Sequence, residues 1–245
     1  GRGLVMLSGG IDAPVAAYLA MNTGLEIECI HFESTPLTPI ESVQKVIDLT
    51  YRLSKFSNGL KIKLHLVPFR DIHEMLIKDV EEPYLITIMR RMMYRIAEKI
   101  AKANNDKVII SGDSIGQVAS QTIESLITVQ DVISSLVVRP LSTYDKQDII
   151  KIARKIKTLD KSNRPFSDCC TVYVPKNPII KPSTYKANMI EENLDFEDKI
   201  SLAVKNTKSI WIKDREKINI IDKGFTVEEA INEVVGNWKV DIKTL

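Results

Sequence analysis

Short apolar runs rich in β-branched residues alternate along the chain with longer segments in which apolar residues recur every three or four positions. This alternation predicts βα units wound into a parallel sheet. The expected strands cover residues 4–7, 25–32, 61–67, 107–111 and 136–138. The expected helices cover residues 14–23, 40–55, 83–104, 116–127, 145–156, 183–205 and 226–235. Together they predict an α/β fold with a doubly wound, parallel, five-stranded sheet.

Ligands of such sheets bind outside the carboxyl ends of the strands. The loops that follow Leu7, Phe32, Ser111 and Val138 are therefore the places where chemistry is expected. The proline-rich stretch 160–182 has no helical or strand period. It is predicted to be a long functional loop, because irregular segments of this length are uncommon in compact domains.

The composition describes an ordinary folded domain. The 245 residues carry 34 Lys and Arg against 32 Asp and Glu, so the chain lacks the strong basic surplus typical of nucleic-acid-binding domains. Its three cysteines include no CxxC pair, which leaves a structural zinc or an iron–sulfur cluster without its usual ligands. This cysteine usage fits a reducing cytosol, and no apolar run is long enough to span a bilayer. We therefore expect a cytoplasmic protein without a membrane partner.

The first expected strand leads directly into a glycine-containing loop, Ser8 to Ala13, and then into a helix. Two glycines let the backbone approach a ligand closely, and the N–H groups at a helix N-terminus form an anion site. The loop lacks the Gly-Lys-Ser/Thr ending of a Walker loop and the third glycine of a dinucleotide fingerprint. On its glycines alone, it is either a phosphate site or an ordinary tight connection.

Two further positions carry polar residues that a ligand would explain. Ser111, Gly112 and Asp113 follow the fourth strand, where a carboxylate can hold Mg²⁺ or a ribose; a capped turn is the alternative. Lys146 lies in the first turn of an expected helix, where its charge opposes the helix dipole. An anionic ligand would offset that unfavourable placement, although a solvated lysine is the simpler interpretation.

The cysteines divide into two kinds. Cys169 and Cys170 lie in the irregular loop with Arg164 and Lys161 nearby, and neighbouring cations in an exposed loop would lower a thiol pKa. Cys29 lies inside an apolar strand and is expected to be a small core residue.

The string Ser-Gly-Gly-Ile-Asp after a strand resembles the loop of the N-type (PP-loop) ATP pyrophosphatases, enzymes of the adenine nucleotide alpha hydrolase-like fold that cleave ATP to AMP and pyrophosphate. Three further stretches, 90–97, 111–122 and 139–150, are similar to the tRNA 4-thiouridine synthetases, sulfurtransferases also named for thiamine biosynthesis. The string Gly-Gln-Val-Ala-Ser-Gln-Thr at 116–122 is the most specific part. Ala13 departs from the family pattern, which has serine there; this removes one hydroxyl donor but leaves the backbone N–H groups.

The resemblance implies a reaction and a set of site residues. ATP, with Mg²⁺, would adenylate O4 of the uridine at tRNA position 8, and a persulfide sulfur would displace AMP to give 4-thiouridine. The implied catalytic residues are Asp12, Lys146 and one of Cys169 and Cys170, with Cys169 favoured by counting. No residue is assigned as a protein ligand of a metal. The implied nucleotide-binding residues are Leu7, Ser8, Gly9, Gly10, Ile11, Asp12, Ala13, His31, Phe32, Arg91, Ser111, Gly112, Asp113, Gly116, Gln117 and Gln121.

The resemblance also implies partners and a domain organisation. The partners are tRNA, a cysteine desulfurase or another persulfide donor, and a second copy of the chain in a homodimer. The pyrophosphatase and sulfurtransferase domain is expected over residues 1–205, followed by an extension of unknown role, 206–245. The family's ferredoxin-like and THUMP domains are expected to have preceded Gly1, and no rhodanese-like domain is expected. We therefore expect the chain alone to bind ATP but to hold tRNA weakly.

Other functions stay open at this point. Sulfur transfer for thiamine thiazole synthesis is a second activity of the family. Another PP-loop adenylating enzyme, acting on a different tRNA base or forming an amide, would need no thiol for amide formation. A nucleotide-binding module without catalysis is motivated by Ala13 and by the missing sulfur carrier.

The near-neutral total charge hides a local surplus. Residues 139–186 contain 11 Lys and Arg against 4 Asp and Glu. This stretch includes the lysine helix and the cysteine loop, where ATP phosphates and a tRNA backbone would converge.

Overall fold

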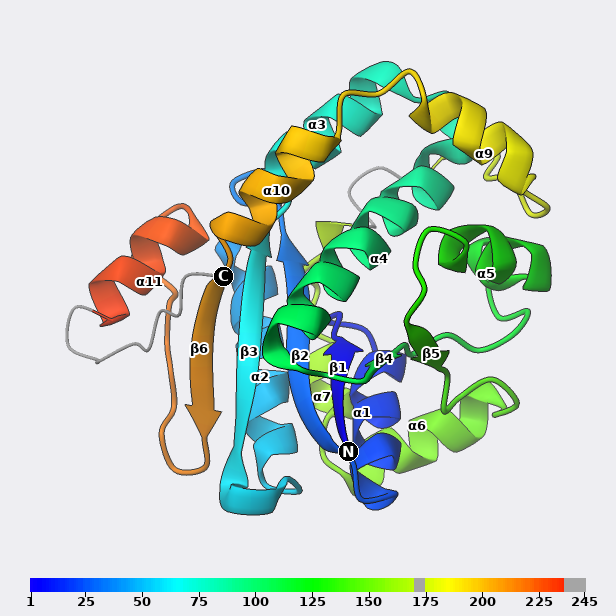
Figure 1. Cartoon of the computed structure of the whole chain (residues 1–245). Helices are drawn as coiled ribbons and strands as arrows, with labels where there is room; N and C mark the ends of the chain where they lie inside the picture. Colours follow the sequence, from blue (N-terminus) through cyan, green and yellow to red (C-terminus); the bar gives the residue numbers. More distant parts are fainter. Residues whose placement is uncertain (170–174, 236–245) are drawn as a thin grey trace.

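A computed structural model describes residues 1–169 and 175–235, and within these residues it has one six-stranded sheet with helices on both faces (Figure 1). Each strand alternates its side chains between the two faces of the sheet, so that every central strand supplies two separate cores. The strands are β1 (Arg2–Met6), β2 (Glu26–Glu33), β3 (Lys61–Pro68), β4 (Val108–Ile110), β5 (Leu136–Val138) and β6 (Lys208–Lys213).

The order of the strands locates the point where a ligand would bind. The sheet runs β5-β4-β1-β2-β3-β6; all neighbouring pairs are parallel except β3 and β6, which are antiparallel. The chain proceeds from β1 to β2 and β3 on one side, and then returns to place β4 on the other side of β1. In an open parallel sheet the crevice at such a reversal binds the ligand. The loops after β1 and β4 border that crevice.

Two helical layers cover the sheet (Figure 1). The described helices are α1 (Asp12–Asn22), α2 (Ile40–Ser54), α3 (Arg70–Asp79), α4 (Leu85–Asn104), α5 (Ile123–Gln130), α6 (Lys146–Lys155), α7 (Leu159–Ser162), α9 (Thr184–Glu191), α10 (Glu197–Lys205) and α11 (Val227–Val235). Helices α3, α4 and α10 share one core with Leu4 and Ile30, whereas α1, α2, α6 and α11 share the other with Val5 and Cys29. The two cores are therefore separated by the sheet alone.

The expected five parallel strands are confirmed, but the strand count is wrong because β6 was not predicted. Its sequence alternates buried Ile210 and Ile212 with exposed Trp211 and Lys213, which is the pattern of an edge strand with one buried face. Residues of the expected extension, Ile218 and Ile220 among them, pack into the same core as α1 and α2. The described part of the expected extension, residues 206–235, thus adds the sixth strand to the sheet.

Three helix predictions need correction. Residues 116–122 are a loop with a short 3₁₀ turn (Ala119–Gln121), because Gly116 has φ of 76° and Thr122 caps α5 through Ser125 N. The expected helix 183–205 is divided into α9 and α10. Helix α3 was missed, although its apolar residues recur at helical spacing. The expected long loop, 160–182, begins inside the short helix α7 (Leu159–Ser162), and its residues 170–174 lie outside the described residues.

Arg91 lies in a buried ionic cluster that joins α4 to α9. Its guanidinium donates to both carboxylate oxygens of Glu191, at 2.9 and 2.8 Å, and to the carbonyl oxygen of Thr128 at 2.7 Å. Arg95 donates to the same carboxylate at 2.7 Å. Because a buried charge is tolerated only when paired, this cluster accounts for Arg91 structurally. The prediction that Arg91 contacts the nucleotide is not supported by its position.

A second buried ionic cluster lies near the amino ends of β1 and β4. The Nε2 atom of His65 is 2.8 Å from Glu28 Oε2, and Arg2 also pairs with Glu28. The Asp106 carboxylate, fully buried, lies 3.6 Å from Arg2 Nε. Burial, together with the nearby Glu28 charge, raises the pKa of Asp106 to about 7.

None of the described helices is long and apolar enough to cross a bilayer.

Asp106 predicts how the stability depends on pH. A folded-state pKa raised from 3.8 to about 7 stabilises the fold below pH 4, and that contribution is lost as the pH rises toward 7. We expect Asp106→Asn to remove this slope and to increase the free energy of unfolding at pH 8 by about 2–4 kcal/mol. Urea unfolding at several pH values measures this free energy and its pH slope, and Asp71→Asn, at an exposed site, is the control. An unchanged pH slope in Asp106→Asn would contradict the assignment.

Candidate functional site

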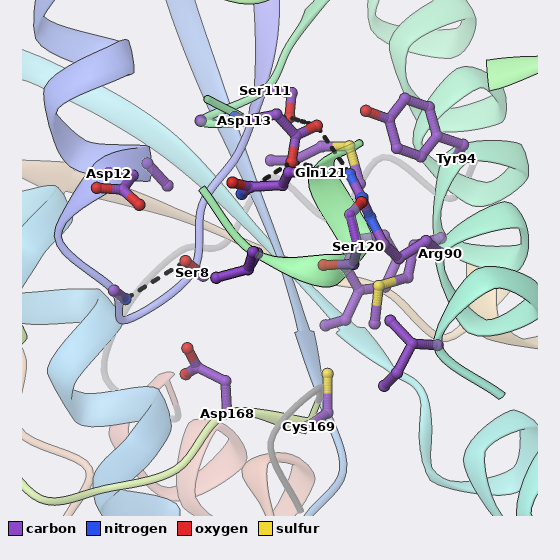
Figure 2. A pocket seen from close by; sticks show the side chains of 18 of the residues that line it. Ser8, Asp12, Arg90, Tyr94, Ser111, Asp113, Ser120, Gln121, Asp168 and Cys169 are labelled. Atoms are coloured by element: carbon purple, nitrogen blue, oxygen red, sulfur yellow. Dashed lines mark hydrogen bonds and ion pairs between the residues drawn. The ribbon is translucent and has the colours of Figure 1, made fainter. Parts of the chain in front are cut away.

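A cavity of about 560 Å³ opens at the crevice between the carboxyl ends of β1 and β4. Figure 2 shows Asp113 and Ser111 toward one end of it and Asp168 and Cys169 toward the other. The described residues that line it are Met6, Leu7, Ser8, Gly10, Asp12, Ala13, Ile30, His31, Phe32, Pro83, Ile86, Thr87, Arg90, Met93, Tyr94, Ser111, Gly112, Asp113, Val118, Ala119, Ser120, Gln121, Asp168, Cys169, Pro175, Pro178 and Ile179. Of the predicted loops, those after Leu7 and Ser111 line it, together with β2, α4 and the cysteine loop, whereas the loops after Phe32 and Val138 contribute no lining residue.

The loop between β1 and α1 forms the floor of the cavity. Helix α1 begins at Asp12, so the first N–H groups of this helix, which have no partner within a helix, lie at the cavity. Gly112, after β4, packs directly on this loop: a Cβ atom there would lie 2.8 Å from both Ala13 N and Ala13 Cα. Glycine is therefore required at position 112 for the two loops to meet.

Asp12 and Lys146, the two predicted catalytic residues outside the cysteine loop, form an ion pair. Lys146 Nζ is 2.7 Å from Asp12 Oδ1, and Gln117 Nε2 donates to Asp12 Oδ2 at 3.3 Å. The Lys146 side chain is 40% exposed, so its ammonium remains open to solvent. Asp145 caps α6 through Gln147 N, which confirms the position of Lys146 in the first helical turn. The ammonium thereby lies beside the N-terminus of α1, where an anion would also lie.

Asp113 is the centre of a second charged group at the cavity. Arg90 donates to both of its carboxylate oxygens, at 2.9 and 2.7 Å, and Arg139 Nε lies 3.6 Å away. Ser111 Oγ donates to Asp113 at 2.7 Å. Burial alone would raise the pKa of Asp113, but Arg90, Ser111 and Arg139 together hold it below its ordinary value. The carboxylate is therefore ionised at neutral pH, and both of its oxygens accept hydrogen bonds within the protein.

His31 lines the cavity at the end of β2 with its imidazole nearly fully buried. Its Nδ1 lies 3.0 Å from the carbonyl oxygen of Leu7. Burial lowers the pKa of His31, so the ring is neutral at pH 7 and Nδ1 donates to that carbonyl. Phe32, the next residue of β2, also lines the cavity, so a neutral imidazole and an aromatic ring are both available to a flat heteroaromatic group.

The cysteine loop reaches the same cavity. Cys169 lines it but is only 4% exposed, so the expectation of an exposed loop is wrong at this residue. Cys170 lies outside the described residues. Cys29 is fully buried in β2, and burial raises the pKa of its thiol far above the ordinary value, as expected for a core residue. Among the described cysteines, Cys169 alone lies at the cavity.

Most of the predicted site residues come together. Gly9 and Ile11 lie within the lining loop. Three predicted residues do not line the cavity but bond to residues that do: Gly116 to Gln121, and both Gln117 and Lys146 to Asp12. Sequence reasoning missed Asp168 and Tyr94, and it chose Arg91 in place of its neighbour Arg90. Ser120, within the motif at 116–122, also lines the cavity. Each of these had a sequence signal that could have found it: Asp168 adjoins Cys169, and Arg90 and Tyr94 lie in the stretch 90–97 that carries the resemblance.

Comparisons with known proteins agree with this geometry. Residues 1–196 match the family described as thiamine biosynthesis protein (ThiI). A probable tRNA sulfurtransferase of Acholeplasma laidlawii (strain PG-8A) is 49% identical over 232 residues, which is 95% of this chain and 56% of that protein. A crystal structure of a 4-thiouridine synthetase–RNA complex with bound ATP aligns with a TM-score of 0.83 at 35% identity, over 87% of this chain and 55% of that one.

A more distant likeness concerns the fold alone. NMN synthetase from Francisella tularensis aligns with a TM-score of 0.52 at 15% identity, over 84% of this chain and 82% of that one. The chain spans a little more than half the length of the sulfurtransferase and the 4-thiouridine synthetase that it matches. Since the family match covers residues 1–196, the chain belongs to the ThiI family.

Proposed function

We propose that this chain is the ATP-using part of a tRNA sulfurtransferase that converts the uridine at tRNA position 8 to 4-thiouridine. The observation that carries the proposal is that a thiol, Cys169, and the loop Ser8 to Ala13 line one cavity. Sulfur transfer needs a sulfur carrier next to the carbon that ATP activates, whereas amide formation needs none. The match to a 4-thiouridine synthetase with bound ATP supports the same assignment.

In the first step, O4 of the uridine attacks the α-phosphorus of ATP, and pyrophosphate leaves. The N–H groups at the start of α1 and the Lys146 ammonium would stabilise the charge that develops on the departing phosphates. His31 and Phe32 would contact the adenine, and Asp113 would accept hydrogen bonds from the ribose hydroxyls.

Asp12 is the carboxylate that would hold Mg²⁺ together with phosphate oxygens, and the ion would neutralise phosphate charge. The described residues contain no group of three or more His, Cys, Asp or Glu side chains that could hold a metal ion. Mg²⁺ would therefore arrive with the nucleotide, because one carboxylate plus phosphates is a common way to bind it.

In the second step, the terminal sulfur of a protein persulfide attacks C4 of the adenylated uridine and AMP leaves, which joins the uridine to the carrier cysteine through an S–S bond. A second thiol then attacks the cysteine sulfur of that bond, so that 4-thiouridine leaves and a disulfide forms, which an external thiol reductant reduces. The persulfide would be carried by Cys169 or Cys170, supplied by a cysteine desulfurase or another donor of sulfane sulfur. We further propose that tRNA is bound mainly by parts of the protein outside this chain, since the alignments cover only 56% and 55% of the two relatives. Thiamine thiazole synthesis is a second use of the same sulfur chemistry.

Lys146 tests the ATP half of the proposal. We expect Lys146→Ala, in the intact protein, to lower the rate of 4-thiouridine formation about 100-fold or more, because a donor to developing charge is lost. The rate is measured on tRNA lacking 4-thiouridine by the near-ultraviolet absorbance of the product. Lys151→Ala, on the exposed face of the same helix, is the matched control and should react normally. Equal rates for the two variants would contradict the role of Lys146 in stabilising the departing phosphates.

The cysteines test the sulfur half. We expect the double variant Cys169→Ser and Cys170→Ser to bind ATP as the wild type does but to form no 4-thiouridine. Equilibrium dialysis measures the binding, and the absorbance assay measures the product. Full product formation by the double variant would instead favour an adenylating enzyme that uses no protein thiol.

A further inference from the structure

Asp168 makes a direct contact between the cysteine loop and the loop that follows β1. Its Oδ2 atom accepts a hydrogen bond of 2.9 Å from the backbone N–H of Gly9. Asp168 also precedes Cys169 in the chain, and both side chains line the cavity (Figure 2). A carboxylate therefore lies on a backbone N–H of the loop that the proposed function assigns to phosphates.

Residues 162–166, which precede Asp168, are hydrogen-bonded to the loop after β1 and to α2. Ser162 Oγ donates to the Gly10 carbonyl oxygen at 3.0 Å. Lys45, from α2, is only 4% exposed and donates to the carbonyl oxygens of Ser162, Arg164 and Phe166 at 3.4, 3.2 and 2.9 Å. These bonds hold residues 162–166 on the loop while Asp168 forms the last contact before Cys169.

Lys45 and Asp168 pack closely on Gly9: a Cβ atom on Gly9 would lie 2.2 Å from Lys45 Cε and 3.0 Å from Asp168 Oδ1. The backbone N–H of Gly9 already donates to Asp168. A phosphate oxygen that accepts from the same N–H would therefore compete with the carboxylate for this donor. Two anions at one donor also repel each other. Phosphate and Asp168 cannot occupy the Gly9 N–H together.

We propose that Asp168 is a positioning residue that holds the Gly9 N–H until the pyrophosphate part of ATP displaces it, and that this displacement carries Cys169 out of its buried position. The inference rests on the proposed function, which puts ATP phosphates at this loop. Its consequence is an order of events: the thiol becomes reactive after the nucleotide binds. Sulfur held on the protein is then protected from discharge while ATP is absent.

The sign of an affinity change separates this role from a merely structural one. Removing a competing anion should tighten anion binding, whereas loss of a structural contact would leave it unchanged or weaken it. We expect Asp168→Ala in the full 245-residue chain to bind pyrophosphate about fivefold to tenfold more tightly than the wild type. Asp168→Asn keeps the hydrogen-bond acceptor but lacks the charge, so it should lie between the two. Calorimetric titration with pyrophosphate and with ATP measures the affinities.

The thiol provides an independent readout. In a Cys170→Ser background, alkylation by iodoacetamide reports on Cys169, because Cys29 is fully buried. Pyrophosphate should accelerate alkylation several-fold when Asp168 is present. In Asp168→Ala, alkylation should be fast from the start and independent of pyrophosphate. Asp160→Asn, an exposed carboxylate eight residues earlier, changes the net charge equally and should behave as the wild type. Thermal unfolding confirms that each variant is folded.

The outcomes distinguish the two proposals. A wild-type chain that binds neither ATP nor pyrophosphate would overturn the proposed function and this inference with it. Normal wild-type binding, with unchanged or weaker binding in both Asp168 variants, would overturn the inference and leave the proposed function standing. An alkylation rate of Cys169 that does not respond to pyrophosphate in the wild type would also overturn it.

Discussion

The close backbone contact between Gly112 and Ala13 is the constraint on which the cavity depends. It brings the loop after β4 against the start of α1, with no space for a side chain at position 112. Because β1 and β4 are neighbours in the sheet, this contact lies at the reversal of strand order. Asp12 and Asp113 thereby line one cavity from two different loops.

Each of these two carboxylates is held by a cation from a helix on a different face of the sheet. Lys146 of α6 pairs with Asp12, and Arg90 of α4 pairs with Asp113. Both cations are therefore positioned by protein contacts alone, which lowers the entropy cost of organising the site around a charged ligand. The acidic and basic residues balance locally, in keeping with a chain whose net charge is only +2.

Local features of the site could be predicted from the sequence, and long-range ones could not. The Ser8 to Ala13 loop and the first-turn position of Lys146 depend on neighbouring residues, so strand and helix patterns were sufficient to place them. Arg90 and Arg91 are adjacent, yet one lines the cavity and the other pairs with Glu191, 100 residues away. The helix period predicts α4 but not which polar neighbour faces which partner. Likewise, the contact of Asp168 with Gly9 spans 159 residues.

The proposed function requires this cavity to cleave ATP between its α- and β-phosphates to activate a uridine. The most direct measurement is ³¹P NMR of ATP turnover by the intact protein with tRNA and a sulfur donor, beside the 4-thiouridine formed. The expected products are AMP and pyrophosphate, each formed in the same amount as 4-thiouridine. ADP and inorganic phosphate as the products, or 4-thiouridine formed without ATP cleavage, would contradict it.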